Sequence, residues 1–196
     1  MADISTDQVK QLRDQTGISV MQCRKALEEA GGDFSKAMVI LRKKGAEVAA
    51  KKADRSLGSG VVAAYIHAGG LVGAMVELSS ETDFVSGNDE FKALAYNIAM
   101  QVAATNPEFL KTEEITAEAR KTAAEVFAKE VQAKPAAIKE KILEGKLQAY
   151  FADKVLVNQS YIKNPEITVA GLIDAAVQKF GEKIEIRRFA RFSTKG

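Results

Sequence analysis

The pair Gly69-Gly70 stands between two runs rich in β-branched and apolar residues, Val61 to Ala68 and Leu71 to Ser79. Consecutive glycines accept the positive φ angles that a tight two-residue turn between antiparallel strands requires. The pattern therefore predicts a β-hairpin over these residues. Because an isolated hairpin is only marginally stable in water, the rest of the chain has to supply a further strand or a covering helix.

A third strand is predicted near the C-terminal end of the sequence. Apolar and charged side chains alternate from Ile184 to Phe192, as expected of a strand with one buried face. Apolar residues also recur at helical spacing in several segments between the hairpin and this strand. We expect helices at 91–106, 116–132, 135–151 and 168–180. The expected fold class is therefore α+β, with a small three-stranded antiparallel sheet covered by helices.

The sequence before the hairpin predicts three short helices. Ser5, Ser19 and Asp33 are residue types that cap helix N-termini, and apolar residues at helical spacing follow each of them. Three helices in about 45 residues bury only a small core, so this segment is expected to present a surface rather than enclose a pocket. The alanine-rich stretch from Gly45 to Gly60 then predicts a helical linker ending in a flexible joint.

Composition and missing motifs restrict the function. The chain is 46% hydrophobic and 28% charged, has no uninterrupted apolar run of membrane-spanning length, and opens on polar residues, so we expect a cytoplasmic protein without a membrane segment. One cysteine, Cys23, and one histidine, His67, leave no disulfide framework and no zinc site. No phosphate-binding, dinucleotide, nucleophile-elbow or zinc-protease motif occurs. We therefore expect no catalytic residues, cofactor or metal, and a function through binding.

An aromatic residue, Phe84, stands beside Asp83 in the polar segment that joins the hairpin to the next helix. Two interpretations remain open on spacing alone. Phe84 either folds back as a staple on the following helix, or projects with Asp83 towards a partner. In the second case, burial in the partner would contribute ~1.5–3 kcal/mol.

Basic residues are concentrated at the two ends of the chain, which suggests nucleic-acid binding as an alternative function. Residues 1–56 carry 11 basic and 8 acidic side chains, 59–115 carry 2 and 8, and 116–196 carry 15 and 10. No aromatic residue interleaves the basic residues Lys51, Lys52 and Arg55, which weakens the case for base stacking. Steep salt dependence would distinguish nucleic-acid binding, which we do not expect, from binding to a protein.

Two long segments resemble signatures of the elongation factor Ts family. The stretch from Leu12 to Leu27, LRDQTGISVMQCRKAL, resembles the N-terminal signature, and Glu77 to Val85, ELSSETDFV, resembles the second. Residues 186–189 are similar to the last strand of the family. The resemblance extends over essentially the whole chain.

This resemblance implies a fold, a function and a partner. The fold is a ubiquitin-associated-like three-helix domain with its helical linker, residues 1–54, followed by an α+β dimerisation core, residues 55–196. The function is that of a translation elongation factor that binds EF-Tu·GDP, dislocates Mg²⁺ and promotes GDP release so that GTP can bind. A plain ubiquitin-associated-like interaction module would leave residues 82–85 without a purpose.

The resemblance also implies which residues contact EF-Tu. Asp83 and Phe84 enter its GTPase domain near the Mg²⁺ site, with Thr82 and Val85 setting the loop, and the core reaches further parts of EF-Tu. The implied contacts of the N-terminal domain with the GTPase domain are Leu12, Arg13, Thr16, Gly17 and Val20.

The match is to the short form of the family. Longer relatives carry a second core subdomain and a helical hairpin, for which we expect no room here. A single core copy implies a symmetric homodimer. Ala190 stands where some short relatives have a cysteine, so the dimer is expected to be non-covalent. Residues 158–163 depart from the Gln-Pro-Phe-Val type common in the family, which leaves the local backbone open.

Overall fold

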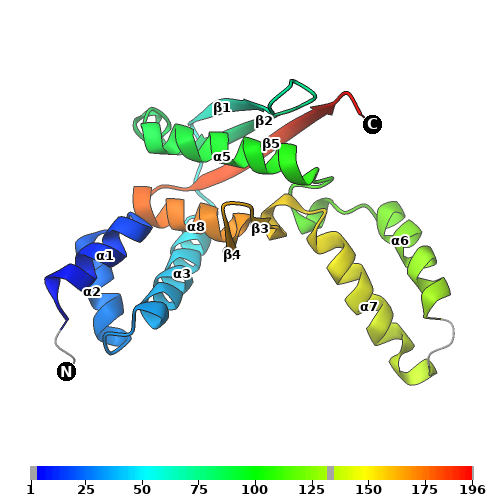
Figure 1. The fold of residues 1–196 in the computed structure, drawn as a ribbon, viewed down its shortest axis with the longest axis horizontal. Helices are drawn as coiled ribbons and strands as arrows, with labels where there is room; N and C mark the ends of the chain where they lie inside the picture. Colours follow the sequence, from blue (N-terminus) through cyan, green and yellow to red (C-terminus); the bar gives the residue numbers. More distant parts are fainter. Residues whose placement is uncertain (1–3, 132–134, 196) are drawn as a thin grey trace.

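The predicted strands form one antiparallel sheet, in the order β1-β2-β5. In the computed structural model, which describes residues 4–131 and 135–195, β1 spans Ser59–Ile66, β2 spans Val72–Ser80 and β5 spans Ile184–Ser193 (Figure 1). The hairpin and the third strand are thus confirmed. The turn is longer than the two residues expected, because pairing stops at Ile66 and Gly73 and the His67 N–H donates to the Val72 carbonyl. Gly69 and Gly70 have the expected positive φ angles, 86° and 70°.

Helices α5 (Asp89–Thr105) and α8 (Val169–Phe180) cover one face of this sheet. Inward side chains of β2, such as Val76 and Leu78, share a core with Phe91 and Ile98 of α5, and all four are at most 1% exposed. The opposite sheet face remains open to solvent. The α+β class and the small three-stranded sheet are therefore confirmed.

The N-terminal segment forms three helices around a separate small core. They are α1 (Thr6–Thr16), α2 (Val20–Glu29) and α3 (Phe34–Lys51). Ser5, Ser19 and Asp33 cap them as expected, each accepting a hydrogen bond from a backbone N–H in the first turn. The first part of the expected linker belongs to α3, which continues to Lys51.

Helix α3 also joins the three-helix unit to the core, because it packs along α8. Gly45 permits this contact: a Cβ there would lie 3.4 Å from the Asp174 carbonyl oxygen and 3.0 Å from the Gln178 side-chain oxygen. Arg42 adds a hydrogen bond to the Glu166 carbonyl at 3.2 Å. The two units therefore share an interface and are not connected by the linker alone.

Helices α6 (Ala117–Glu130) and α7 (Ala136–Ala152) form an antiparallel hairpin that projects from the core on the side away from α1–α3. A small apolar cluster that includes Leu147 and Phe151 holds it, together with ion pairs such as Arg120–Glu144 at 2.8 Å. The expectation that the chain has no room for a helical hairpin is therefore wrong. Residue 132, which we expected in the first of these helices, lies outside the described residues.

The segment whose backbone the sequence left open, 158–163, begins at the last residue of 3₁₀ turn η2 (Leu156–Asn158). It then forms β3 (Ser160–Tyr161) and the link to β4 (Asn164–Thr168). A further 3₁₀ turn, η1, spans Thr112–Glu114.

The buried Gln101 fixes the backbone that follows η2. Its amide NH₂ donates to Gln159 and to the Ser160 carbonyl, and its amide oxygen accepts from the Ile162 N–H at 2.8 Å.

We predict that Gln101→Ala lowers the free energy of unfolding by about 2–4 kcal/mol, because it removes these bonds and leaves the Ile162 N–H without its partner. Urea denaturation measures the change. Gln11→Ala, at an exposed helix position, is the matched control and should change stability by less than about 0.5 kcal/mol. Equal effects of the two substitutions would contradict the role given to Gln101.

Candidate functional site

The segment between β2 and α5, which we expected to be a loop, contains one turn of helix, α4 (Asp83–Ser86). Neighbouring side chains on this turn point in opposite directions. Val85 is 4% exposed and belongs to the core, whereas Phe84 is 86% exposed, more than any other large apolar side chain in the part of the chain that the structure describes. Asp83 is exposed as well. The interpretation of Phe84 as a staple on α5 is therefore wrong.

Two glutamates hold the N-terminal side of this turn against the connection between α8 and β5. The Glu81 carboxylate accepts from the Lys183 backbone N–H at 2.6 Å and from the Arg55 guanidinium at 3.1 Å. These donors lower the pKa of Glu81, the Lys183 N–H having the largest effect, so the anchor is ionised at neutral pH. In the opposite direction, the Glu182 carboxylate accepts two hydrogen bonds from Thr82.

The C-terminal side of the turn is held by burial. Ser86 is 6% exposed, and its hydroxyl lies 2.7 Å from the hydroxyl of Ser59 at the start of β1. The turn is thus fixed on both sides of Phe84, while the Phe84 ring itself lies almost entirely in solvent. The four residues predicted to act together, Thr82 to Val85, therefore lie at one anchored turn, with Val85 buried beneath it.

The expected contact residues of the N-terminal helices divide into exposed and buried positions. Arg13, Gly17 and Val20 are exposed. Thr16 is half-buried, and its hydroxyl donates to the Leu12 carbonyl at 2.7 Å. Leu12 is 0% exposed in the three-helix core, so a direct contact with a partner is contradicted by its burial.

Two features of this site were missed by reasoning from the sequence. Met21, next to Val20, is 68% exposed and extends the apolar surface at the start of α2. Its position inside the N-terminal signature could have suggested it. Glu182 is separated from Thr82 by 100 residues, and no local pattern connects the two.

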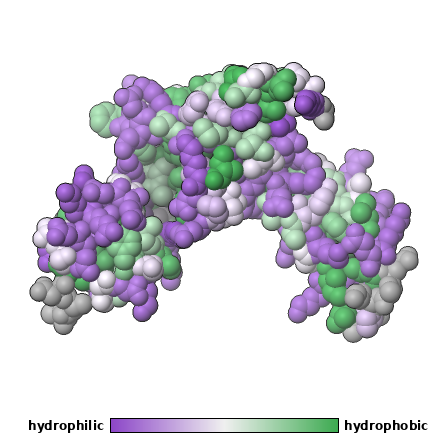
Figure 2. Space-filling model, in the orientation of Figure 1, coloured by the Kyte–Doolittle hydropathy of each residue, from purple (hydrophilic) through white to green (hydrophobic). Residues whose placement is uncertain are grey.

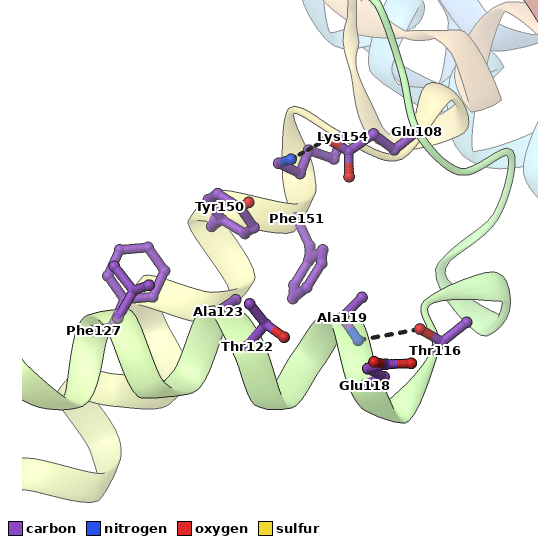
Figure 3. Close-up of a pocket in the computed structure, with 11 residues that line it drawn as sticks. Glu108, Thr116, Glu118, Ala119, Thr122, Ala123, Phe127, Tyr150, Phe151 and Lys154 are labelled. Carbon is purple, nitrogen blue, oxygen red and sulfur yellow. Dashed lines mark hydrogen bonds and ion pairs between the residues drawn. The ribbon is translucent and has the colours of Figure 1, made fainter.

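A hollow of about 520 Å³ lies elsewhere, between the two helices of the α6–α7 hairpin and Glu108 (Figure 3). Phe127 of α6 and Tyr150 and Phe151 of α7 line it. Burial by itself would lower the pKa of Lys154, but the Glu108 carboxylate and the Tyr150 hydroxyl beside the ammonium group raise this pKa overall. A lysine held in its charged form cannot act as a general base.

Over residues 4–131 and 135–195, no cluster of three or more histidine, cysteine, aspartate or glutamate side chains is placed to hold a metal ion. None of the helices described there combines the length and apolar character that crossing a bilayer requires.

An exposed aromatic ring and carboxylate on a rigidly anchored helical turn are typical of a protein that acts by contact with another protein. Comparison with known proteins gives the class a name. The family model described as "Elongation factor TS" matches residues 38–178. The chain is 48% identical over 191 residues to elongation factor Ts of Carboxydothermus hydrogenoformans, covering 96% of this chain and 88% of that protein. It is 46% identical over 190 residues to elongation factor Ts of Thermotoga petrophila, covering 97% and 96%. The chain belongs to the elongation factor Ts family.

The exposure of Phe84 generates a stability prediction with an internal control. Phe84→Ala should change the free energy of unfolding by no more than about 0.5 kcal/mol, because the ring contributes no burial. Phe91→Ala, in the core at 0% exposure, should cost about 3–5 kcal/mol. Chemical denaturation of both variants compares them, and a large loss for Phe84→Ala would show that the ring is structural.

Proposed function

We propose that this protein is the guanine nucleotide exchange factor of EF-Tu, acting as a translation elongation factor in the cytoplasm. It binds EF-Tu·GDP, dislocates Mg²⁺ and promotes GDP release so that GTP can bind. The observation that carries this proposal is the exposed Phe84 beside Asp83, on a turn anchored on both sides, in a chain of the elongation factor Ts family.

The two side chains have different tasks in this mechanism. Phe84 moves from water into the GTPase domain, and burial of its ring provides ~1.5–3 kcal/mol to hold a rearranged set of partner side chains. Asp83 disturbs the network that holds Mg²⁺. Since Mg²⁺ is a major counter-charge of the diphosphate, its displacement weakens GDP binding.

This mechanism is a negative coupling between two ligands of EF-Tu. The exchange factor lowers the affinity for GDP by some factor, and GDP lowers the affinity for the exchange factor by the same factor. No covalent bond is made or broken, so the protein is not an enzyme in the bond-breaking sense. Its binding free energy is used to lower a barrier to dissociation.

The three-helix unit, which we propose to be ubiquitin-associated-like, docks on the same GTPase domain through Arg13, Thr16, Gly17 and Val20. Leu12 supports this surface from below, and the core reaches other parts of EF-Tu. Nucleic-acid binding by the linker is disfavoured, because two of its basic side chains are used within the protein. Lys52 donates to the Gly181 carbonyl at 2.7 Å, and Arg55 is paired with Glu81.

The open face of the sheet supports a homodimer. Val62, Ile66, Met75 and Phe192 are 47–70% exposed on this face, and Ala190 pairs directly opposite Met75. Apolar residues of β1 and β2 also form much of the upper surface in Figure 2. Exposed apolar side chains gathered on one sheet face favour association, and a symmetric dimer is the commonest solution.

We predict that the protein is a non-covalent dimer at a protein concentration of roughly tens of micromolar. Reductant should leave this dimer unchanged. Met75→Asp should convert it to a monomer in sedimentation velocity, because it places a charge in the centre of the apolar face. Val39→Asp, at an exposed apolar position of α3 outside the sheet, is the control and should leave the dimer intact. A monomer for the unmodified protein would contradict the proposal.

Exchange itself is tested by the release of fluorescent GDP from EF-Tu. The unmodified protein should accelerate release, and Phe84→Ala should slow exchange markedly both in excess Mg²⁺ and with chelator. Asp83→Asn should slow exchange chiefly when Mg²⁺ is present, because its proposed role is to disturb the metal's network. An unchanged rate of GDP release from EF-Tu at a saturating concentration of the unmodified protein would refute the exchange function.

A further inference from the structure

The connection between α8 and β5, residues 181–183, lies directly against the start of α4. Within it, one Glu182 carboxylate oxygen lies 3.0 Å from the Thr82 backbone nitrogen and the other lies 2.6 Å from the Thr82 hydroxyl. Thr82 is the residue that precedes α4, and its backbone is extended, with φ −125° and ψ 160°. Both donors of one residue are therefore bound by a single carboxylate.

A helical turn of four residues does not hold its own shape, because helix nucleation is unfavourable and one turn gains few hydrogen bonds. The Thr82 side chain, which would ordinarily cap this turn, makes no capping hydrogen bond to it. It is directed to Glu182 instead. The direction in which Asp83 and Phe84 leave the surface thus depends on further contacts. On the Thr82 side these come from Glu182, from Glu81 and from the Ser80 hydroxyl, which donates to the Thr82 carbonyl at 2.9 Å.

The same connection also fixes the three-helix unit. Lys52 at the end of α3 donates to the Gly181 carbonyl at 2.7 Å, and the Lys183 ammonium donates to the carbonyl of Ala53 at 2.6 Å. Residues 181–183 therefore hold both surfaces that the proposed function brings to EF-Tu. They set the position of the Phe84 turn relative to the N-terminal helices.

We infer that Glu182 is a positioning residue for nucleotide exchange: its carboxylate holds Thr82 so that Asp83 and Phe84 are presented in the orientation that releases GDP. The inference rests on the proposed exchange function. Glu182 itself need not touch EF-Tu. A carboxylate suits the role because it accepts at both oxygens, whereas an amide offers one acceptor and one donor group.

The experiment is GDP release from EF-Tu with increasing concentrations of each variant. Glu182→Ala should lower the maximal release rate about tenfold, the factor that corresponds to about 1.4 kcal/mol. The half-saturating concentration should change little, because the N-terminal helices still dock. Glu182→Gln should restore part of the rate, since its amide oxygen can accept from the Thr82 N–H and its NH₂ can donate to the hydroxyl. Glu125→Ala, an exposed carboxylate on α6, controls for the lost charge.

A double-mutant cycle separates positioning from general stability. If Glu182 acts through the turn, Glu182→Ala should have a clearly smaller effect once Phe84→Ala is present, because only the orientation of Asp83 is then left to disturb. The melting temperature of each variant shows whether it is folded. A further variant, Thr82→Val, replaces only the hydroxyl with a methyl group. Thr82→Val should lower the rate in the same direction as Glu182→Ala.

The outcomes distinguish this inference from the function on which it rests. If the unmodified protein does not accelerate GDP release, the exchange function is overturned, and the inference with it. If the unmodified protein accelerates release and folded Glu182→Ala does so equally well, the inference alone is overturned. Effects of Glu182→Ala and Phe84→Ala that multiply independently also overturn it.

Discussion

Burial of the central strand β2 is the constraint on which the rest of the structure depends. The strand is paired on both sides, and its inward face lies under α5, where Leu78 and Phe91 are 0% exposed. Each large apolar side chain removed from water contributes roughly 1.5–3 kcal/mol, so the end of β2 is among the most firmly held points of the chain. Helix α4 begins three residues beyond it. The packing of the core therefore determines where the exposed Phe84 lies.

The contrast between Phe84 and Val85 shows how a well-packed scaffold can expose one apolar side chain while it buries the next. Val85 is anchored in the core, and its neighbour is exposed to water on the same short turn. An exposed phenylalanine contributes little to folding, which leaves its free energy of burial available for association. The hydrogen bonds of Glu81 and Glu182 hold the backbone just before these two residues in place.

Much of the fold could be predicted because its signals are local. The glycine pair, the alternation in β5 and the caps at Ser5, Ser19 and Asp33 each act within a few residues. The turn containing Phe84 was found from residue type, but spacing could not decide whether the ring is buried.

The parts that escaped prediction depend on contacts between distant segments. The bond between Thr82 and Glu182 joins residues 100 positions apart. Leu12 was assigned to a surface by family resemblance, although packing against the other two helices buries it. The sequence predicted α6 and α7 as two helices. Their antiparallel arrangement depends on contacts between the two helices, such as the Arg120–Glu144 ion pair, which no local pattern indicates.

We propose that Phe84 leaves water when the protein binds EF-Tu, and this burial can be observed directly. The chain contains no tryptophan, so Phe84→Trp introduces a single reporter. Its emission and acrylamide quenching are measured alone and with EF-Tu·GDP, after subtraction of the signal of EF-Tu. We predict the emission of an exposed indole in the free protein, and blue-shifted emission shielded from acrylamide in the complex. A complex that accelerates GDP release while the indole remains exposed would show that exchange does not require burial of this side chain.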